Sequence, residues 1–319
     1  MKQILLTCDT EIGELGKNVD NAFDIFVRGR ICGQTIGVEL INTIANEYDV
    51  KVNHFIDVYY PGQEKNIILL CEDILSGGHA IGLHTHPSSR FGNRYMYNYS
   101  KEEQDKIIFW GKNFLYKEVG IDVNAHRAGG YGTDNSIFEV LKNNGIYIDS
   151  SFFYKNEICK IQYPYKNLSA KMHGIWEVPI TVYEENRFLC GCELQNRKAV
   201  KKLDFRYGSN SKDILSVIDK SPQNTVIVLF LHSFNFIKLK YSIKNKKFNP
   251  FEVDNNLINE YRILLQGLRS RKDCIFSDLN SLNLENCRDD YCISMDKNVD
   301  IQKVIKEKFS ERILRRIKV

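Results

Sequence analysis

Two histidines stand one residue apart in the segment IGLHTHP, and a proline follows them directly. A residue that precedes proline is disfavoured in the helical conformation, so His86 is predicted to be extended. Side chains at positions i and i+2 of an extended chain lie on the same face, which lets His84 and His86 approach one point. The same spacing gives Asp9 and Glu11 a shared face at the end of the first apolar segment.

Two imidazoles and one carboxylate are a ligand set suited to a catalytic zinc, or to another divalent first-row metal, with a position left for water. The second carboxylate could then serve as general base toward that water. The spacing alone leaves open whether Asp9 or Glu11 binds the metal. An isolated H-x-H motif is also compatible with packing, but the D-x-E motif and a late histidine, His232, favour a metal site.

The segments that would hold these residues alternate between strand-like and helix-like patterns. Short apolar segments such as QILLTC, KVNHFIDVYY, HAIGLHTH and TVIVLFLHSF are separated by amphipathic helical patterns. Ser100 and Glu103 form a capping-box sequence before one predicted helix, and Gly120 ends it. This order favours an α/β architecture with parallel strands inside and helices outside.

Polar residues stand at the carboxyl ends of several of the apolar segments. They are Asp9, Glu11, His84, His86, Arg127, Asp149 and His232. In parallel barrels and open α/β sheets, catalytic groups collect at the carboxyl ends of the strands. We therefore expect these residues to meet at one end of a sheet.

The composition excludes several classes of protein. Of 319 residues, 43% are hydrophobic and 12% aromatic, which indicates a globular chain. The net charge of +4 is too small to argue for nucleic-acid binding. No apolar segment approaches the ~18 residues of a membrane span, and the first residues do not resemble a signal peptide. Nine cysteines without secretory features indicate reduced thiols and predict a cytoplasmic protein.

Five segments together resemble the polysaccharide deacetylase family, the NodB-like group of metal-dependent carbohydrate esterases and amidases. They are LTCDTE, IGLHTHP, HRAGGYGTDNSIFEVLKNNGIYIDSS, WEVPI and VLFLHSF, in the family's order and rough spacing, and the match covers residues 4–236. The resemblance implies a distorted (β/α)7 barrel. It also implies hydrolysis of an N-acetyl group with the help of a divalent metal, zinc first, with cobalt, manganese, iron or nickel as alternatives.

The resemblance assigns roles residue by residue. Asp9 matches the general base, His84 and His86 the metal-binding histidines, Arg127 the arginine that orients the base, and His232 the histidine that protonates the leaving amine. The backbone near Gly130 and Tyr131 matches the segment that receives the oxyanion. Asp149 lies in the segment whose acidic residue can tune His232.

The chain departs from the family pattern at three places. Thr10 stands where many members have the metal-binding acid, and Glu11 is the nearest substitute, so we assign Glu11 to the metal. The histidines are spaced H-x-H rather than H-x-x-x-H. The loop after Arg127 reads RAGGYG, whose two glycines allow the backbone to come close to a substrate.

Other residues have less defined expectations. His54 is expected in the core or behind the ligands, His79 in a structural turn, and His126 on the face opposite Arg127. Tyr95, Tyr97 and Tyr99 could stack on sugar rings or pack on the barrel rim. Five lysines in residues 237–247 could attract a phosphate or form a solvated loop.

The chain is predicted to form a deacetylase-like barrel over residues 1–282 and a tail over residues 283–319. The tail ends in a basic amphipathic helix that could dock on the barrel, on a second subunit or on a membrane surface. The expected substrate is an N-acetylated sugar, carried by a nucleotide or a lipid phosphate, in an intracellular step of surface-glycan synthesis. The alternatives are an amidase for small non-sugar substrates and a sugar-binding barrel without catalysis.

Overall fold

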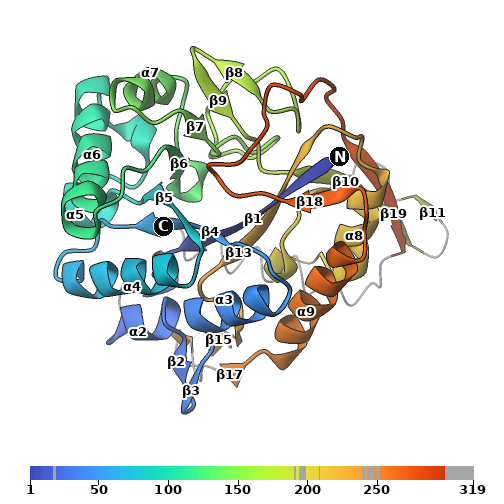
Figure 1. Ribbon diagram of the computed structural model, residues 1–319, viewed down its shortest axis with the longest axis horizontal. Coiled ribbons are helices and arrows are strands. Elements are labelled where there is room, and N and C mark those ends of the chain that lie inside the picture. Colours follow the sequence, from blue (N-terminus) through green and yellow to red (C-terminus); the bar gives the residue numbers. More distant parts are fainter. Residues whose placement is uncertain are drawn as a thin grey trace.

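A sheet of nine strands forms the centre of the protein (Figure 1). The computed structural model describes residues 1–298 except 17–18, 190–191, 194–198, 208, 239–240, 243–246 and 249–251. Along the path β13–β1–β4–β5–β6–β7–β9 every neighbouring pair is parallel. These strands are β1 (Lys2–Thr10), β4 (Asn53–Asp57), β5 (Ala80–Thr85), β6 (Ala125–Ala128), β7 (Ile148–Asp149), β9 (Ile175–Glu177) and β13 (Val226–His232). β8 (Ala170–Met172) pairs antiparallel with β9, and β18 (Cys274–Phe276) runs parallel to β1.

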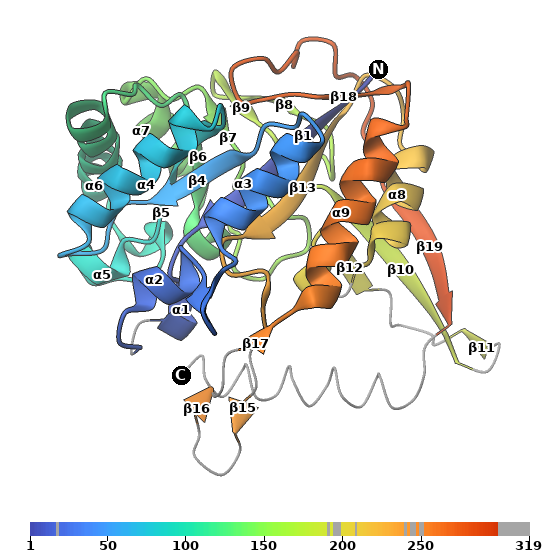
Figure 2. The same ribbon diagram turned by 60° about the horizontal axis from the view of Figure 1, so that its bottom comes forward.

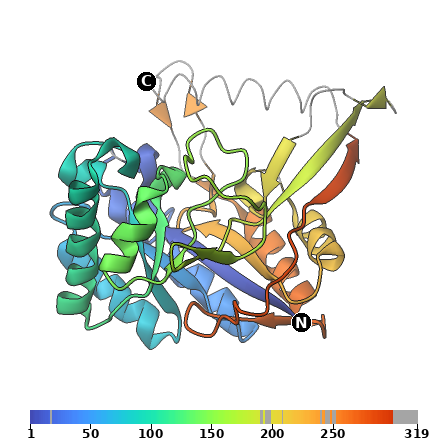
Figure 3. The ribbon, with the colours of Figure 1, turned by 90° about the horizontal axis from the view of Figure 1, so that it is seen from above.

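Helices cover the outside of the curled sheet, as Figures 2 and 3 show. The longer ones are α3 (Val38–Glu47), α4 (Glu64–Ser76), α6 (Lys101–Phe114), α7 (Ser136–Asn143), α8 (Ser211–Lys220) and α9 (Asn255–Arg269). The capping box predicted at Ser100 and Glu103 is present at the start of α6. A π-helical turn, η2 (Leu115–Val119), continues α6 to Gly120, whose φ of 81° ends the helix in the left-handed conformation.

Short helical segments follow several strand ends. They are α1 (Gly13–Gly16), α2 (Ala22–Phe26), α5 (Ser88–Phe91), η1 (Met96–Asn98), η3 (Gly129–Tyr131) and η4 (Phe205–Tyr207). Three two-stranded ribbons complete this region: β2 (Arg30–Ile31) with β3 (Gln34–Thr35), β14 (Ile237–Lys238) with β17 (Glu252–Val253), and β15 (Tyr241–Ser242) with β16 (Lys247–Phe248). The alternation of strands and helices predicted from the sequence is thus confirmed as an α/β fold.

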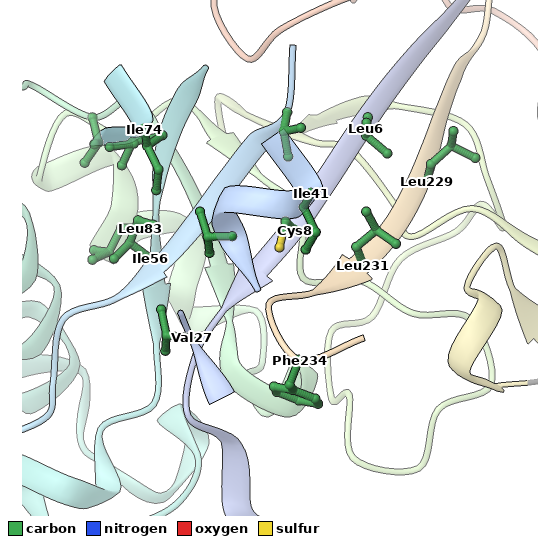
Figure 4. Close-up of a cluster of buried hydrophobic side chains, with 14 of the residues drawn as sticks. Leu6, Cys8, Val27, Ile41, Ile56, Ile74, Leu83, Leu229, Leu231 and Phe234 are labelled. Carbon is green, nitrogen blue, oxygen red and sulfur yellow. The ribbon is translucent and has the colours of Figure 1, made fainter. Parts of the chain in front are cut away.

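The strands have two buried faces, and each faces a different hydrophobic layer. Residues of one parity, such as Leu6, Cys8, Leu229 and Leu231, pack between the sheet and the helices, where Ile41 of α3 and Ile74 of α4 meet them (Figure 4). Residues of the other parity fill the inside of the curled sheet: Leu5, Phe55, Ala125, Ile148, Val178, Val226, Val228 and Phe230. Burial on both faces explains why these strands are apolar throughout rather than alternating.

Residues 155–215 contain most strands of a second, smaller sheet. β10 (Val182–Leu189) pairs with β11 (Cys192–Glu193), β12 (Ala199–Lys202) and β19 (Ile293–Asn298). Residues 283–298 therefore pack on the main body: Leu284 is buried and Asn283 donates its backbone N–H to Gln3 at 2.7 Å. The boundary at residue 282 stays a prediction, and the amphipathic helix lies outside the described residues. None of the described helices has the length and apolar character to cross a membrane.

Two carboxyl groups face each other on neighbouring strands of the main sheet. Asp149 of β7 is directly opposite Glu177 of β9, and both side chains are fully buried. Burial, followed by the charge of Asp149, raises the pKa of Glu177 well above its ordinary value. Glu177 accepts a hydrogen bond from the backbone N–H of Phe152 at 3.0 Å. The pair is accommodated when Glu177 carries a proton.

We expect Glu177→Gln to stabilise the protein increasingly as the pH rises. A carboxyl whose pKa is raised by folding contributes stability below its unfolded pKa and loses it as the pH rises through the folded pKa. The amide is neutral throughout, so its advantage over wild type should grow by about 1 kcal/mol or more between about pH 5 and about pH 8. Urea unfolding of both proteins measures this difference. Glu118→Gln, at an exposed carboxyl, is the control, and an advantage that does not change with pH would contradict the assignment.

Candidate active site

Polar side chains continue the inward-facing rows of apolar residues at the carboxyl ends of five strands. The strand register places Asp9 of β1 beside His232 of β13, and His84 of β5 between Asp57 of β4 and Arg127 of β6. All of these side chains are buried. Asp9, His84, Arg127 and His232, four of the residues predicted to meet at one end of the sheet, therefore do so.

A three-residue cluster at this end has the geometry of a metal centre. Glu11, His84 and His86 each offer a ligand atom, and these atoms lie within 4.8 Å of one another. The Nε2 atom of His84 is 3.4 Å from Oε2 of Glu11, and Nε2 of His86 contacts the same oxygen. The two imidazole rings are 4.8 Å apart between centroids. The H-T-H-P segment thus turns both rings toward Glu11, as the extended conformation predicted.

The hydrogen-bond pattern of His84 fits a metal ligand. Its Nδ1 atom lies 2.9 Å from the backbone carbonyl of Arg127, which can only accept a hydrogen bond. Nδ1 of the neutral ring therefore carries the hydrogen, and Nε2 presents its lone pair to Glu11 and His86. Within the described part of the chain, neither His84 Nε2 nor Glu11 Oε2 makes a hydrogen bond, although both atoms are buried. A divalent cation would satisfy both atoms.

Asp9 is held by a buried guanidinium rather than by the histidines. Its Oδ1 accepts a hydrogen bond from Nη1 of Arg127 at 2.7 Å, while its Oδ2 lies 3.7 Å from Nε2 of His84. Arg127 is fully buried, and it also donates to Thr7 and to both the backbone and the side chain of Ser150. Asp9 therefore presents one oxygen toward the cluster and keeps the other bound to Arg127.

Both carboxylates are stabilised in the charged form. Burial raises the pKa of Asp9, but the Arg127 guanidinium and then His84 outweigh it, and the net pKa is lowered. Burial likewise opposes ionisation of Glu11, yet His86 and His84 hold its pKa well below the ordinary value. A charged Glu11 is the form that binds a metal, and a charged Asp9 is the form that accepts a proton.

Thr10, which stands where many deacetylases have an acid, points away from the cluster. Its hydroxyl lies 2.9 Å from Nδ1 of His54, and Nε2 of His54 lies 2.8 Å from the amide oxygen of Asn42. Burial lowers the pKa of His54 to about 3, so this histidine is neutral. His54 is therefore a core residue, as expected. Because Thr10 points to the other face, the next residue on the face of Asp9 is Glu11.

The turn after β6 packs directly on the cluster of Glu11, His84 and His86. Gly130 has a φ of 56° and Tyr131 a φ of 63°, a conformation that residues other than glycine rarely adopt. A side chain at Gly129 would place its Cβ 2.5 Å from the ring of His86. The RAGGYG sequence therefore allows a close approach between this turn and a proposed metal ligand.

His232 is enclosed by aromatic rings and by a second group of charges. Its ring lies 4.9 Å from the rings of both Phe230 and Phe234. Its Nδ1 atom is 3.8 Å from Oδ2 of Asp204, a fully buried carboxylate. Burial, followed by the charge of Lys202, lowers the pKa of His232 to about 4, against the opposing effect of Asp204.

The structure does not bring Asp149 to His232. Ile148 faces the inside of the sheet, so Asp149 points to the other face, where its Oδ1 lies 2.8 Å from Nδ1 of His126 and accepts from Ser151 at 2.7 Å. His126 in turn lies 2.9 Å from the Thr85 hydroxyl and faces away from Arg127, as predicted. The carboxylate that faces His232 is Asp204, which the sequence reasoning missed.

Asp57 is a further buried carboxyl that the sequence reasoning missed. It ends β4 beside His84 and accepts the backbone N–H of Tyr59 at 3.1 Å. Burial raises its pKa to about 6, against the charges of His86 and His84. Its position at the end of the strand KVNHFID was the available signal, because the other polar strand ends were recognised in the same way.

The remaining expectations concern residues around the site. Tyr95 packs on the turn after β6, close to the Cα atom of Gly132, and stacks near Tyr97 with ring centroids 5.3 Å apart. The hydroxyl of Tyr99 donates to the backbone of Asn93 at 2.9 Å. His79 accepts the backbone N–H of Val52 at 3.2 Å, as a structural residue does. Much of the lysine-rich segment 237–247 lies outside the described residues.

The fold is shared with solved structures of low sequence identity. A “putative polysaccharide deacetylase” from Mycobacterium smegmatis is 14% identical, with a TM-score of 0.53, over 88% of this chain and 87% of that one. A 4-alpha-glucanotransferase from Thermococcus litoralis is 11% identical, with a TM-score of 0.52, over 99% of this chain and 48% of that one. No family model and no curated sequence matches the chain. The predicted polysaccharide deacetylase type of fold is thus confirmed.

We expect purified protein to contain a divalent metal that His84→Ala loses. The substitution removes a ligand whose orientation is fixed by Arg127, and the two remaining ligands bind a cation too weakly to retain it through dialysis. Elemental analysis of dialysed wild-type and variant protein measures the metal content. His173→Ala, which removes an exposed histidine, is the matched control and should keep the wild-type content. Equal metal in wild type and His84→Ala would exclude the proposed centre.

We expect Gly129→Ala to weaken metal binding without changing any ligand. The added Cβ would overlap the His86 ring, while the backbone conformation of Gly129 is one that alanine tolerates. A displaced ligand typically lowers metal affinity about 10- to 100-fold. Competition with a chromophoric chelator measures the affinity. Gly77→Ala, where the nearest side-chain atom is 3.2 Å away and belongs to His79, is the control; unchanged affinity in Gly129→Ala would show that His86 is not a ligand.

Proposed function

We propose that the protein is a metal-dependent hydrolase that removes an acetyl group from an N-acetylated sugar. The observation that carries this proposal is the convergence of Glu11, His84 and His86 beside a carboxylate, Asp9, that is bound to a buried arginine. The shared fold does not decide the chemistry, because structures named for two different activities have it. The side chains at the strand ends support hydrolysis of an amide.

The metal would be held by Glu11, His84 and His86. When bound, it would supply a Lewis acid for the acetyl oxygen and lower the pKa of a water molecule. The donor set of two imidazoles and one carboxylate fits zinc best, and it also accommodates cobalt, manganese, iron or nickel. We assign the carboxylate ligand to Glu11 because its Oε2 contacts both histidines.

Asp9 is proposed as the general base. Arg127 occupies Oδ1 of Asp9, which leaves Oδ2 to accept a proton on the side of His84. The turn at Gly130 and Tyr131 is proposed to receive the negative charge that develops on the acetyl oxygen, because it packs against His86.

His232 is proposed to protonate the departing amine. Its pKa of about 4 makes the ring neutral near neutral pH before substrate binds. Negative charge that develops beside it during the reaction raises the pKa, and Asp204 at 3.8 Å acts in the same direction. The histidine can then take up a proton and deliver it to the amine.

The substrate is proposed to be a sugar carried by a nucleotide or a lipid phosphate, in a cytoplasmic step of surface-glycan synthesis. The support for a phosphate is the sequence alone: five lysines in residues 237–247 follow the strand that ends at His232. Acetate release from UDP-linked, lipid-linked and polymeric N-acetylhexosamines tests this finer proposal. Release from long polymers alone would exclude a carrier-linked substrate.

We expect Asp9→Asn and Glu11→Gln to separate base from ligand. Asp9→Asn should reduce kcat for acetate release by at least about 100-fold while the metal content stays at the wild-type level, since only proton transfer is lost. Glu11→Gln should lose both activity and metal.

Acetate release and elemental analysis on the same preparations give both readouts. Glu118→Gln, at an exposed carboxyl, should match wild type in both. Loss of metal in Asp9→Asn with retention in Glu11→Gln would reverse the two roles. The absence of acetate release from every acetylated sugar by metal-loaded wild type would exclude the proposed function.

A further inference from the structure

A buried lysine at the end of β12 contacts the proposed site from the side of the smaller sheet. Only 8% of Lys202 is exposed. Its Nζ atom donates a hydrogen bond to the Tyr131 hydroxyl at 2.9 Å and lies 3.1 Å from Oδ2 of Asp204. The same atom is 3.5 Å from the centre of the Phe230 ring. The ammonium group of Lys202 therefore contacts residues at or near the ends of three strands, β6, β12 and β13.

The burial of this charge requires partners. An ammonium group removed from water costs several kcal/mol unless an opposite charge and hydrogen bonds compensate it. Asp204 supplies the charge, and Phe230 supplies the negative face of an aromatic ring. Asp204 is itself fully buried and accepts the backbone N–H of Arg206 at 2.8 Å, so its position is fixed.

The turn that contains Tyr131 also needs support. Two successive residues with positive φ, Gly130 and Tyr131, are maintained only where tertiary contacts determine them. The Tyr131 ring packs edge-on against Phe153, with centroids 5.0 Å apart, and its hydroxyl is bound by Lys202. Burial, then the charge of Asp9, raises the pKa of Tyr131 well above its ordinary value, so the phenol stays neutral.

We propose that Lys202 is a positioning residue that fixes the turn at Tyr131 relative to the pair formed by Asp204 and His232. The inference rests on the proposed function, in which this turn receives the oxyanion and His232 protonates the amine. The turn and His232 must both be in place for the same transition state. Lys202 donates to Tyr131 of the turn and pairs with Asp204, which faces His232. Its substitution should therefore reduce kcat more than it changes KM.

The charges near His232 come from two parts of the chain, the end of β12 and the end of β1. They are Lys202 of β12, Asp204 after β12, and Asp9 and Glu11 at the end of β1. Lys202→Met would leave Asp204 without its counterion, so Lys202→Met/Asp204→Asn is included to restore neutrality. Recovery of thermal stability in this double variant would show that the uncompensated charge of Asp204 destabilises Lys202→Met. The effect on kcat is judged from Tyr131→Phe, which leaves Asp204 and its counterion in place.

Lys202→Met should lower kcat for acetate release about 100-fold and change KM by less than about threefold. Lys202→Arg keeps the charge, and its kcat should be at least about tenfold higher than that of Lys202→Met. Tyr131→Phe removes only the hydroxyl that Lys202 binds. It replaces Lys202→Met as the test of this hydrogen bond if Lys202→Met does not fold. Because both act through one hydrogen bond, the variant with both substitutions should lose no more than Lys202→Met alone.

Lys171→Met is the matched control. Lys171 of β8 also combines a carboxylate, Glu285 at 2.7 Å, with an aromatic ring, Trp176 at 4.7 Å, but it is not among the site residues. It should keep the kcat of wild type. A kcat of Lys202→Met within about threefold of wild type, or losses that multiply in the variant with Tyr131→Phe, would overturn the proposal.

A measurement without substrate separates this proposal from the proposed function. In protein labelled with ¹⁵N-tyrosine and ¹³C-histidine, Lys202→Met should shift the backbone amide signal of Tyr131 and the ring signal of His232. Lys171→Met should shift neither. If wild type releases no acetate while these shifts occur, the positioning role stands and the proposed function fails. Signals of Lys202→Met that coincide with those of wild type would overturn the positioning role.

Discussion

The ion pair of Arg127 and Asp9 lies in the interior of the sheet, and the arrangement of the site depends on it. A guanidinium that is fully buried must have partners for its N–H groups, because an uncompensated charge there would destabilise the fold by several kcal/mol. Its partners come from β1 and from Ser150 after β7. Its Cζ atom lies 4.2 Å from the ring centre of Phe55 of β4 and 4.9 Å from that of Phe230 of β13. Arg127 thereby connects the ends of strands that are distant in the sequence. Its own carbonyl orients His84, so the same residue organises the proposed base and a proposed metal ligand.

Much of this arrangement could be predicted from the sequence, because it follows from local rules. Alternation along an extended chain places Asp9 and Glu11 on one face and sends Thr10 to the other, where it meets His54. Pro87 limits the conformation of His86 in the same way. The order of strands and helices predicted the α/β fold, and the polar residues at strand ends predicted where the site lies. Each of these inferences uses a spacing of a few residues, which the sequence contains directly.

The error at Asp149, and the failure to identify Asp204 and Lys202, arise from relations between distant segments. Asp149 ends a short strand, but which face it occupies follows from its pairing with His126, and the sequence does not contain that register. Asp204 and Lys202 follow an irregular segment whose strands form a separate sheet, and no periodic pattern relates them to β13. Their contacts with His232 and Tyr131 arise only when this sheet folds against the barrel end. Lysine and aspartate are rarely buried unless paired, and the burial of Lys202 and Asp204 is evident only once this sheet is in place.

The position of Glu11 shows how alternation along β1 decides which residue can lie beside the histidines. An acid at position 10 would point away from His84 and toward α3, as Thr10 does, so it could not bind a metal with these histidines. The next residue on the same face is Glu11, and its longer side chain brings Oε2 to both imidazoles from beyond the end of β1. Likewise His86 lies just past the end of β5, and it needs the bare Cα of Gly129 beside it. What the proposed metal centre requires is therefore a shared face and a nearby glycine, and the D-x-E and H-x-H spacings of this chain supply the shared face.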